Sequence, residues 1–311
     1  MPLPTDPKTV ETSNGIVSVL HEIFGPHPGF RPVHAKGILL SGHFKPTAAA
    51  SSLSKAPHFN NPTTPVIARF SSSTGIPQLP DTDPNGNPRG FALRFQLAET
   101  PRRVHTDIVS HSTPFFPVRT GQEFLDFFTA VRDNKVPDFL STHPKAVVFV
   151  QAPKPFPVSL DREAYFSVNA FKLIDKDGKE TFIRYRFVPE KGVQHLGEED
   201  VKSKPANYLY DEVAHAVPIV FKLVAQIAGP GDVTDDSTVH WPDEREIVQL
   251  GTVTLDKVAD NNPEEQRKII FDPVPRVEGV EPSDDPLIDV RAGVYLISGR
   301  ERRAANPAPA L

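Results

Sequence analysis

Residues 33–44, Val-His-Ala-Lys-Gly-Ile-Leu-Leu-Ser-Gly-His-Phe, form the stretch on which the fold depends. This run predicts a long β-strand, and its two glycines allow the strand to bend. Further runs of strand character follow at 65–71, 90–96, 106–110, 165–174, 181–188, 217–227 and 247–255. About eight strands in one chain predict a closed antiparallel barrel, which can hold one ligand in or beside its mouth.

Two helices are expected beside this barrel. Thr120 can cap the first, because Glu123 stands three residues later and an apolar face begins at Phe124. The Asp-Pro pair at 285–286 is typical of a helix start, and residues 287–303 continue the helical pattern. The fold class is therefore α+β, with β-structure dominant.

The chain is expected to form one main domain. Gly293 and Gly299 would weaken the last helix, so another element is expected to pack closely against it. We found no internal repeat and no clear linker. The expected organisation is an N-terminal arm over 1–30, a barrel domain over 31–303 and a loose tail over 304–311.

Composition excludes several classes of function. Of 311 residues, 38% are hydrophobic and 23% are charged, which is typical of a folded globular protein. The net charge of −5 leaves no basic excess for a nucleic-acid partner, and no apolar run is long enough to span a membrane. No secretory signal is evident, so a cytoplasmic location is expected. With no cysteine, disulfides, iron–sulfur clusters and thiolate-ligated haem are excluded.

Phenylalanine is abundant, at 21 residues against one tryptophan and five tyrosines. Such a composition fits a dry core, and it also fits a pocket for a large flat apolar group. Tyr295 lies one helical turn after Arg291, and a guanidinium beside a phenol stabilises the phenolate. A phenolate is a hard ligand suited to ferric iron, although an Arg–Tyr pair at this spacing also occurs on ordinary surface helices.

Several motifs together resemble the haem catalases. They are Arg-Pro-Val-His-Ala-Lys-Gly at 31–37, Ala-Arg-Phe-Ser at 68–71, Asn-Pro-Arg-Gly-Phe at 87–91 and Arg-Ala-Gly-Val-Tyr at 291–295. They occur in the family's order, and the resemblance covers roughly residues 30–300. It implies a catalase-like eight-stranded antiparallel β-barrel with flanking helices, ending before the C-terminal domain of full catalases.

The resemblance implies haem b as the cofactor and assigns residues to both of its faces. On the open side His34 would be the general acid–base, oriented by Ser71, with Val33 narrowing access to the iron. On the other side Tyr295 would ligate the iron, as tyrosine does in catalases, with Arg291 as its charge partner.

Three more positions would hold the macrocycle itself. Arg31 and Arg69 would pair with the haem propionates, because a guanidinium matches a carboxylate bidentately. Phe124 would stack on the ring.

Three positions depart from the catalase pattern. His111 stands where catalases place an Asn that helps to hold peroxide, whereas Asn169 and Gly299 each stand where catalases place a histidine. Fast dismutation of hydrogen peroxide is therefore not expected. The short ends of the chain would cover the haem less, as in the minimal catalase-related peroxidases, and a wider opening would admit lipid-sized substrates.

Three hypotheses follow for the function. The first is a haem peroxidase that reduces hydrogen peroxide or organic hydroperoxides while oxidising an organic donor. The second is a fatty-acid hydroperoxide isomerase of the allene-oxide-synthase type, against which the retained Val33 argues. The third is a barrel-shaped binding protein that has lost haem. A homodimer or a monomer is possible, because the arms that interlock full catalases are short here.

Overall fold

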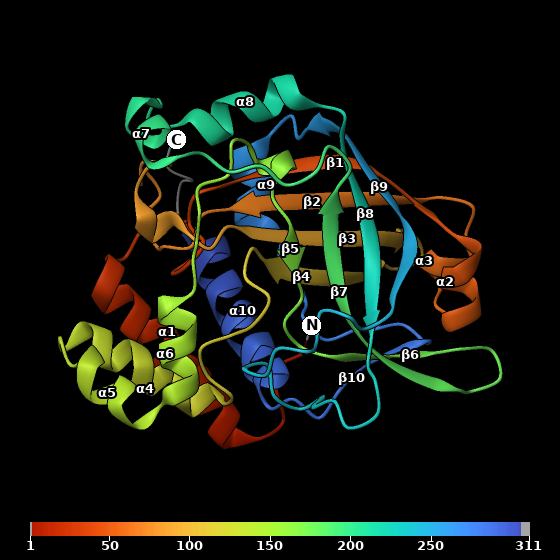
Figure 1. Cartoon of the computed structure of the whole chain (residues 1–311), viewed down its shortest axis with the longest axis horizontal. Coiled ribbons are helices and arrows are strands. Elements are labelled where there is room, and N and C mark those ends of the chain that lie inside the picture. The colour runs from red at the N-terminus through yellow and green to blue at the C-terminus, as the bar shows by residue number, and fades with distance from the viewer. Residues whose placement is uncertain (1, 306–311) are drawn as a thin grey trace.

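The strands form an antiparallel barrel in the computed structural model, which describes residues 2–305. Eight strands close it in the order β1, β2, β3, β4, β5, β7, β8, β9 and back to β1, as expected from the sequence (Figure 1). Their bounds are Gly37–Pro46 for β1, Thr64–Ser71 for β2, Gly90–Ala98 for β3, Val104–His111 for β4, Tyr165–Phe166 for β5, Glu180–Pro189 for β7, Ile219–Ile227 for β8 and Ile247–Val258 for β9. Two short strands, β6 (Phe171–Ile174) and β10 (Val280–Pro282), extend the sheet beyond β7.

Most expected strands match the observed ones to within one to three residues at each end, and two differ more. The first strand begins at Gly37 and not at Val33, because His34 has a φ of 58° that no strand can contain. The expected strand over 165–174 is broken into β5 and β6, and residues 167–170 between them belong to neither. A hairpin turn connects β6 to β7, with Gly178 at a φ of 85°.

The period of two along each strand separates the barrel interior from its outer face. Phe70 and Phe91 point inward and join a core of buried aromatic and aliphatic side chains. Each such phenylalanine contributes roughly 1.5–3 kcal/mol by burial. Buried side chains fill the interior, and the cavity described below lies on the other face of β2–β4. Arg69 and Ser71, which alternate with Phe70 on β2, belong to the other face, and this is the face that forms the site.

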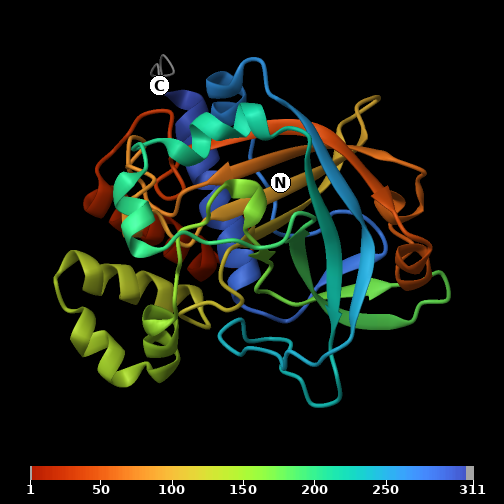
Figure 2. The same cartoon turned by 45° about the horizontal axis from the view of Figure 1, so that its top comes forward.

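Three helices cover the outer face of β2–β4: α1 (Pro7–Phe24), α4 (Gly121–Arg132) and α10 (Leu287–Ala304) (Figures 1 and 2). Helix α1 lies within the segment expected as an N-terminal arm, and the Asp6 side chain caps its start. The expected capping box is present on α4, where Thr120 and Glu123 each accept from the other's backbone N–H. Shorter helices are α2 (Ala48–Leu53), α3 (Pro57–Asn60), α5 (Val136–Thr142), α6 (Pro144–Gln151), α7 (Glu198–Ser203), α8 (Tyr208–Ala216) and α9 (Asn262–Lys268).

The two glycines of α10 do mark close packing. A Cβ at Gly293 would lie 2.3 Å from the Ser13 hydroxyl of α1, and one at Gly299 would lie 2.2 Å from a methyl of Ile270. The helix continues through Ala304, one residue beyond its expected end, and the tail from 306 onward lies outside the described residues.

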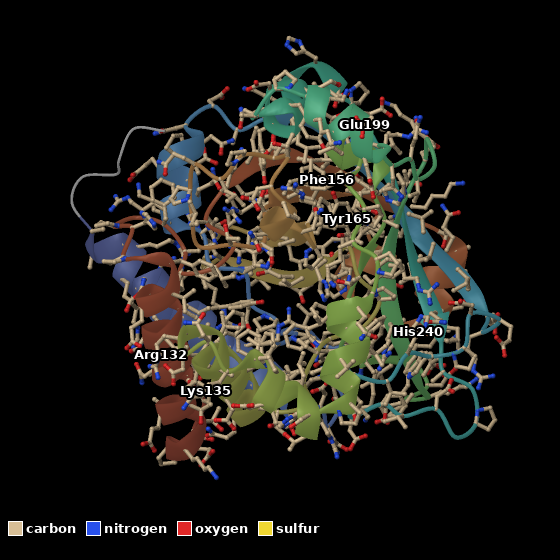
Figure 3. The ribbon with its side chains drawn as sticks, turned by 60° about the vertical axis from the view of Figure 1, so that its left-hand side comes forward. Arg132, Lys135, Phe156, Tyr165, Glu199 and His240 are labelled. Carbon is tan, nitrogen blue, oxygen red and sulfur yellow. The ribbon has the colours of Figure 1, made fainter. Side chains whose placement is uncertain are left out.

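Helices α4, α5 and α6 form a lobe beside the barrel, where Arg132 and Lys135 mark the turn between α4 and α5 (Figure 3). Over residues 2–305, no helix combines the length and apolar character needed to cross a bilayer.

Candidate functional site

A cavity of about 850 Å³ lies between the outer face of β2–β4 and the covering helices. The strands contribute the side chains that alternate with the core residues, among them Arg69 and Ser71 from β2 and His111 from β4. Helices α1, α4 and α10 supply the other walls, so the cavity combines segments from both ends of the chain and from its middle.

His34 reaches this cavity from the loop before β1. Its backbone lies in the left-handed region, which is uncommon for a residue other than glycine and typical of functional sites. Hydrogen bonds hold it there: the His34 N–H donates to Ser73 O at 3.3 Å, and the Ala35 N–H donates to Thr74 O at 2.9 Å. This backbone turns the imidazole onto the sheet, where it lies above Gly90.

Gly90 makes room for the imidazole. A Cβ at this position would lie 2.5 Å from Ser71 Oγ and 2.9 Å from His34 Nδ1, distances at which the contacting atoms would have to shift. The two side chains instead meet directly, with 3.1 Å between Ser71 Oγ and His34 Nδ1. When Nδ1–H donates to the serine, Nε2 carries a free lone pair and can accept a proton.

Burial keeps His34 in its neutral form. Desolvation first, and then the positive charges of Arg69 and Arg31, lower its pKa from 6.5 to about 3. The imidazole is therefore an unprotonated base throughout the neutral pH range.

His111 lies in the same strand row as Ser71 and Gly90, because Ser71 pairs with Gly90 and Gly90 pairs with His111. Its Nδ1 lies 2.6 Å from Thr113 Oγ1, and its Nε2 is buried without a hydrogen-bond partner among the described residues. Desolvation lowers its pKa to about 3. The site thus holds two neutral imidazoles on one wall.

The opposite wall carries a chain of polar side chains on and beside α10. Arg291 Nε and Nη2 donate to Tyr295 Oη at 3.3 and 3.2 Å, so a phenolate here would have a cation beside it. Arg291 also donates to Asn169 Oδ1, and Asn169 Nδ2 donates to Asp285 Oδ2 at 2.7 Å. Asn169, the departure noted in the sequence, thus links the arginine to a buried carboxylate.

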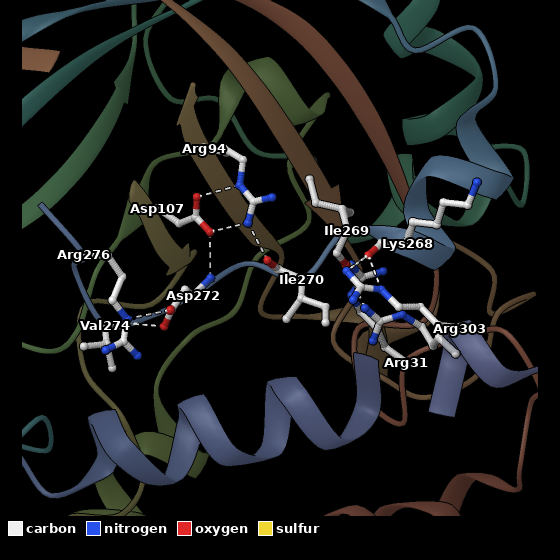
Figure 4. Close-up of polar contacts among 11 residues, drawn as sticks. Arg31, Arg94, Asp107, Lys268, Ile269, Ile270, Asp272, Val274, Arg276 and Arg303 are labelled. Atoms are coloured by element: carbon white, nitrogen blue, oxygen red, sulfur yellow. Dashed lines mark hydrogen bonds and ion pairs between the residues drawn. The ribbon is translucent and has the colours of Figure 1, made fainter. Parts of the chain in front are cut away.

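Three arginines, of which Arg69 and Arg302 are buried and Arg31 is half-buried, meet at one end of the cavity, around the strap formed by residues 266–272. Arg31 donates to Gln266 O and Ile269 O, Arg302 Nη2 donates to the same Ile269 O at 2.8 Å, and Arg69 Nε donates to Gln266 Oε1 at 2.8 Å. Figure 4 shows the strap from Lys268 onward, with Arg31 on the Ile269 carbonyl.

The strap is in turn fixed to the barrel. Arg94 and Asp107, neighbours on β3 and β4, form an ion pair at 2.7 Å, and Asp107 accepts from the Asp272 N–H at 2.7 Å (Figure 4). Arg94 also donates to Ile270 O. These charge-assisted bonds give the arginine cluster a rigid support.

No carboxylate within residues 2–305 pairs with Arg31, Arg69 or Arg302. Desolvation lowers the pKa of Arg69 to about 10 and that of Arg302 to about 9, and Arg302 Nε is buried without a partner. Buried cations without counter-charges are costly, so this end of the cavity fits the anionic groups of a ligand. Two propionates on a flat apolar macrocycle match the arginines and the apolar walls, so the residues present fit haem.

Replacing Arg302 with Leu is expected to change the haem-free and haem-loaded protein differently. Both forms lose the hydrogen bond from Arg302 to Ile269 O, but only the loaded form also loses a partner for a propionate. The difference in free energy of unfolding between the two forms should shrink by roughly 2 kcal/mol, visible as several degrees in Tm by calorimetry. The control is Arg303→Leu, because Arg303 donates to Lys268 O and does not line the cavity. If Arg302→Leu lowered the Tm of the haem-free and haem-loaded forms equally, Arg302 would not be a partner of a propionate.

All nine residues singled out from the sequence line this one cavity: Arg31, Val33, His34, Arg69, Ser71, His111, Phe124, Arg291 and Tyr295. Phe124 lies on α4, where its ring is parallel to that of Phe116 at 5.6 Å. Within residues 2–305, no group of three or more His, Cys, Asp or Glu side chains is arranged to hold a metal ion.

Sequence reasoning missed Arg302, Gln266 and Asp285. A signal for Arg302 existed, because positions 291, 295, 298 and 302 follow the helical repeat on one face of α10. No comparable signal existed for Gln266, which reaches Arg69 only through the fold.

Comparison with known proteins gives consistent results. A family model described as Catalase matches residues 29–308. A catalase-related peroxidase of Synechococcus elongatus is 31% identical over 94% of this chain and 88% of its own. One of Mycolicibacterium paratuberculosis is 33% identical over 95% and 96%. Among solved structures, a bacterial catalase superposes with a TM-score of 0.78 at 25% identity, and the chain spans 61% of its length.

Proposed function

Because the chain belongs to the catalase family, we propose that it is a haem-dependent peroxidase that acts on hydrogen peroxide or organic hydroperoxides. The observation that carries the proposal is the opposition, across one cavity, of the His34–Ser71 pair and the Tyr295–Arg291 pair. The proposed cofactor is haem b. Tyr295 would hold its iron, and Arg31, Arg69 and Arg302 would hold its propionates.

In the proposed reaction, residues of the chain position the peroxide and move a proton between its two oxygens. His34 Nε2 takes the proton from one oxygen of the peroxide and returns it to the other oxygen, which leaves as water or as an alcohol. Ser71 holds the ring in the required orientation, and Val33 limits the space beside it. When bound, haem supplies the electrons that break the O–O bond, and an organic donor then returns two electrons and two protons.

A spectrum and a turnover measurement test this function. Purified protein reconstituted with hemin should show the Soret band and the high-spin ferric features of a tyrosinate-ligated haem. The loaded protein should then oxidise a phenolic dye with hydrogen peroxide at a saturable rate. Protein that takes up no hemin, or loaded protein that oxidises no dye with any peroxide, would refute the proposal.

Replacing His111 with Asn is expected to raise the evolution of oxygen from hydrogen peroxide. Catalases place an amide at this position to hold peroxide, and a misplacement of 1 Å can cost about 100-fold in rate. The gain should therefore reach at most about 100-fold, while dye oxidation changes less. An oxygen electrode measures the first rate and dye absorbance the second. His111→Leu serves as the comparison, since it removes the imidazole and adds no amide. Equal oxygen rates in both variants would show that the amide is not what dismutation lacks.

A further inference from the structure

Helix α1 is a wall of the cavity that only side chains hold against the other walls. It packs beside α4 and α10, and Ile16, Leu20, Ile23 and Phe24 line the cavity (Figure 1). Within residues 2–305, no backbone–backbone hydrogen bond joins residues 7–33 to a segment outside 6–33. The first such bond after α1 is the one that His34 N–H donates.

The polar contacts between α1 and its neighbours are few among the described residues. Ser13 Oγ donates to Val290 O of α10 at 3.3 Å. Two pairs of side chains at the protein surface complete these contacts: His21 with Glu301 of α10 and Glu22 with Arg132 of α4. Surface pairs of this kind contribute little to stability. Apolar packing is therefore the main attachment of α1.

The other walls of the cavity have stronger polar ties. The strands are joined to one another by backbone hydrogen bonds. Helix α10 is bonded to the strap through Arg302 and to Asn169 through Arg291. The segment before α4 is bonded to the loop between β8 and β9, since Phe116 N–H donates to Ser237 O at 3.0 Å. Of these walls, α1 can therefore move with the smallest loss of polar contacts.

The segment after α1 has the form of a hinge. Gly25 and Gly29 have φ values of 83° and 86°, in the left-handed region that glycine adopts without strain. Pro26 and Pro28 lie between them, and each proline ring fixes its own φ. A change in chain direction would therefore concentrate at the two glycines. A few such residues at the end of an element are typical of lids that close over a ligand.

Bound haem would give α1 contacts that the haem-free protein lacks. The four apolar side chains that α1 contributes to the cavity would lie against the macrocycle. Ile23 and Phe24 are only half-buried, so they still have apolar surface to bury. Burial of this surface would favour the closed position of α1 in the loaded form. Docking of α1 and binding of haem are therefore coupled.

We propose that α1 is a lid for the cofactor, which swings out at the hinge of residues 25–29 to admit haem and docks over the macrocycle afterwards. This inference rests on the proposed function, because it takes haem as the group that the cavity binds. It concerns the loading of the cofactor and no step of the peroxide reaction. Entry past Asn85, an exposed residue of the cavity lining, would need no motion of α1.

A disulfide that locks α1 to α4 tests the proposal. A Cβ at Gly15 would lie 3.9 Å from Leu125 Cγ, close to the position of a cysteine sulfur at 125. The double variant Gly15→Cys/Leu125→Cys can therefore form the bond with a small adjustment. Because the chain has no cysteine of its own, no other pairing within the chain competes.

Hemin uptake is followed by Soret absorbance in the oxidised and the reduced double variant. The oxidised form should take up hemin at least about tenfold more slowly, because a disulfide disfavours opening by that factor or more. Gly15→Cys alone and Leu125→Cys alone, treated with the same oxidant, should take up hemin like the unaltered protein. Equal uptake by the oxidised and reduced double variant would overturn the proposal and favour entry past Asn85.

Hydrogen exchange tests the same lid without any substitution. In the unaltered protein, the amides of α1 should exchange faster in the haem-free than in the haem-loaded form. The amides of β8, a barrel strand that does not line the cavity, should exchange alike in both forms. Exchange of α1 that does not change on loading would contradict the coupling between α1 and haem.

Failure of this inference is distinguishable from failure of the proposed function. If the locked protein takes up hemin as fast as the reduced one and the loaded protein oxidises dye, only the lid is wrong. If locking slows uptake but the loaded protein oxidises no dye with any peroxide, the lid stands and the peroxidase function falls.

Discussion

Replacing Tyr295 with Phe is expected to reduce the affinity for haem by more than about 100-fold. Loss of a group that only supports a metal ligand already costs roughly 10–100-fold, and here the ligand atom itself is removed. The arginine cluster and the apolar walls would still attract the macrocycle, so weak binding with an altered spectrum is expected. Titration with hemin, followed by Soret absorbance and by transfer to a haem scavenger, measures the effect.

The control for this experiment is Tyr165→Phe. Tyr165 is fully buried in the barrel core, and its hydroxyl donates to Leu160 O at 2.9 Å, away from the cavity. That variant should bind hemin with an unchanged spectrum. Because phenylalanine occupies nearly the same volume as tyrosine, the Tyr295 variant should keep the fold. Unchanged hemin affinity and spectrum in Tyr295→Phe would mean that another residue holds the iron.

Replacing His34 with Ala is expected to lower peroxide turnover by about 10²–10⁴-fold, the usual contribution of a positioned general acid–base. Hemin uptake should persist, because the substitution leaves Tyr295 and the arginine side chains in place and keeps the backbone carbonyl of residue 34 that accepts from Arg69. Steady-state dye oxidation measures the loss. Ser71→Ala should cost roughly tenfold, since it removes only the group that orients the ring. Turnover in His34→Ala close to that of the unaltered protein would remove His34 from the mechanism.

A matched histidine and a pH profile sharpen this test. His43→Ala should leave turnover unchanged, because His43 is exposed on β1 and pairs with Asp256. A pKa of His34 near 3 leaves the base unprotonated above about pH 4, so lowering the pH from 7 to 5 should not titrate it. A fall in kcat/KM with a midpoint near pH 6.5 that disappears in His34→Ala would show instead that this histidine titrates normally.

The helices show where local pattern was sufficient and where it was not. The capping residues of α4 predicted where the helix begins, and its apolar face predicted that it continues, because both signals are local. Helices α5 and α6 were not expected: they are 7 and 8 residues long, and each begins at a proline-containing turn. Such short helices depend on packing more than on propensity. Packing of α5 and α6 beside α4 is a tertiary effect that no short window contains.

For the site, too, the sequence predicted one part and the tertiary structure supplied the rest. The motifs supplied its chemistry, because a histidine, a tyrosine and arginines have the same donors and acceptors in any fold. They could not show that His34 leaves the strand through a positive φ, or that Gly90 on another strand clears the space for its ring. Nor could they show that the Gln266 carbonyl and side chain hold Arg31 and Arg69.

By itself, the sequence determined the strand pattern, the barrel class and the chemistry of the two facing residues, His34 and Tyr295. The tertiary structure alone decided that the barrel interior is filled, that the cavity lies on its outer face, and that Arg302 shares it with them. The physical reason is that alternation along a strand is a local property. By contrast, contacts between distant segments decide which face of the sheet lies against α10 and which charges in the cavity lack partners. Arg31 and Ile269, for example, are more than 200 residues apart in the sequence.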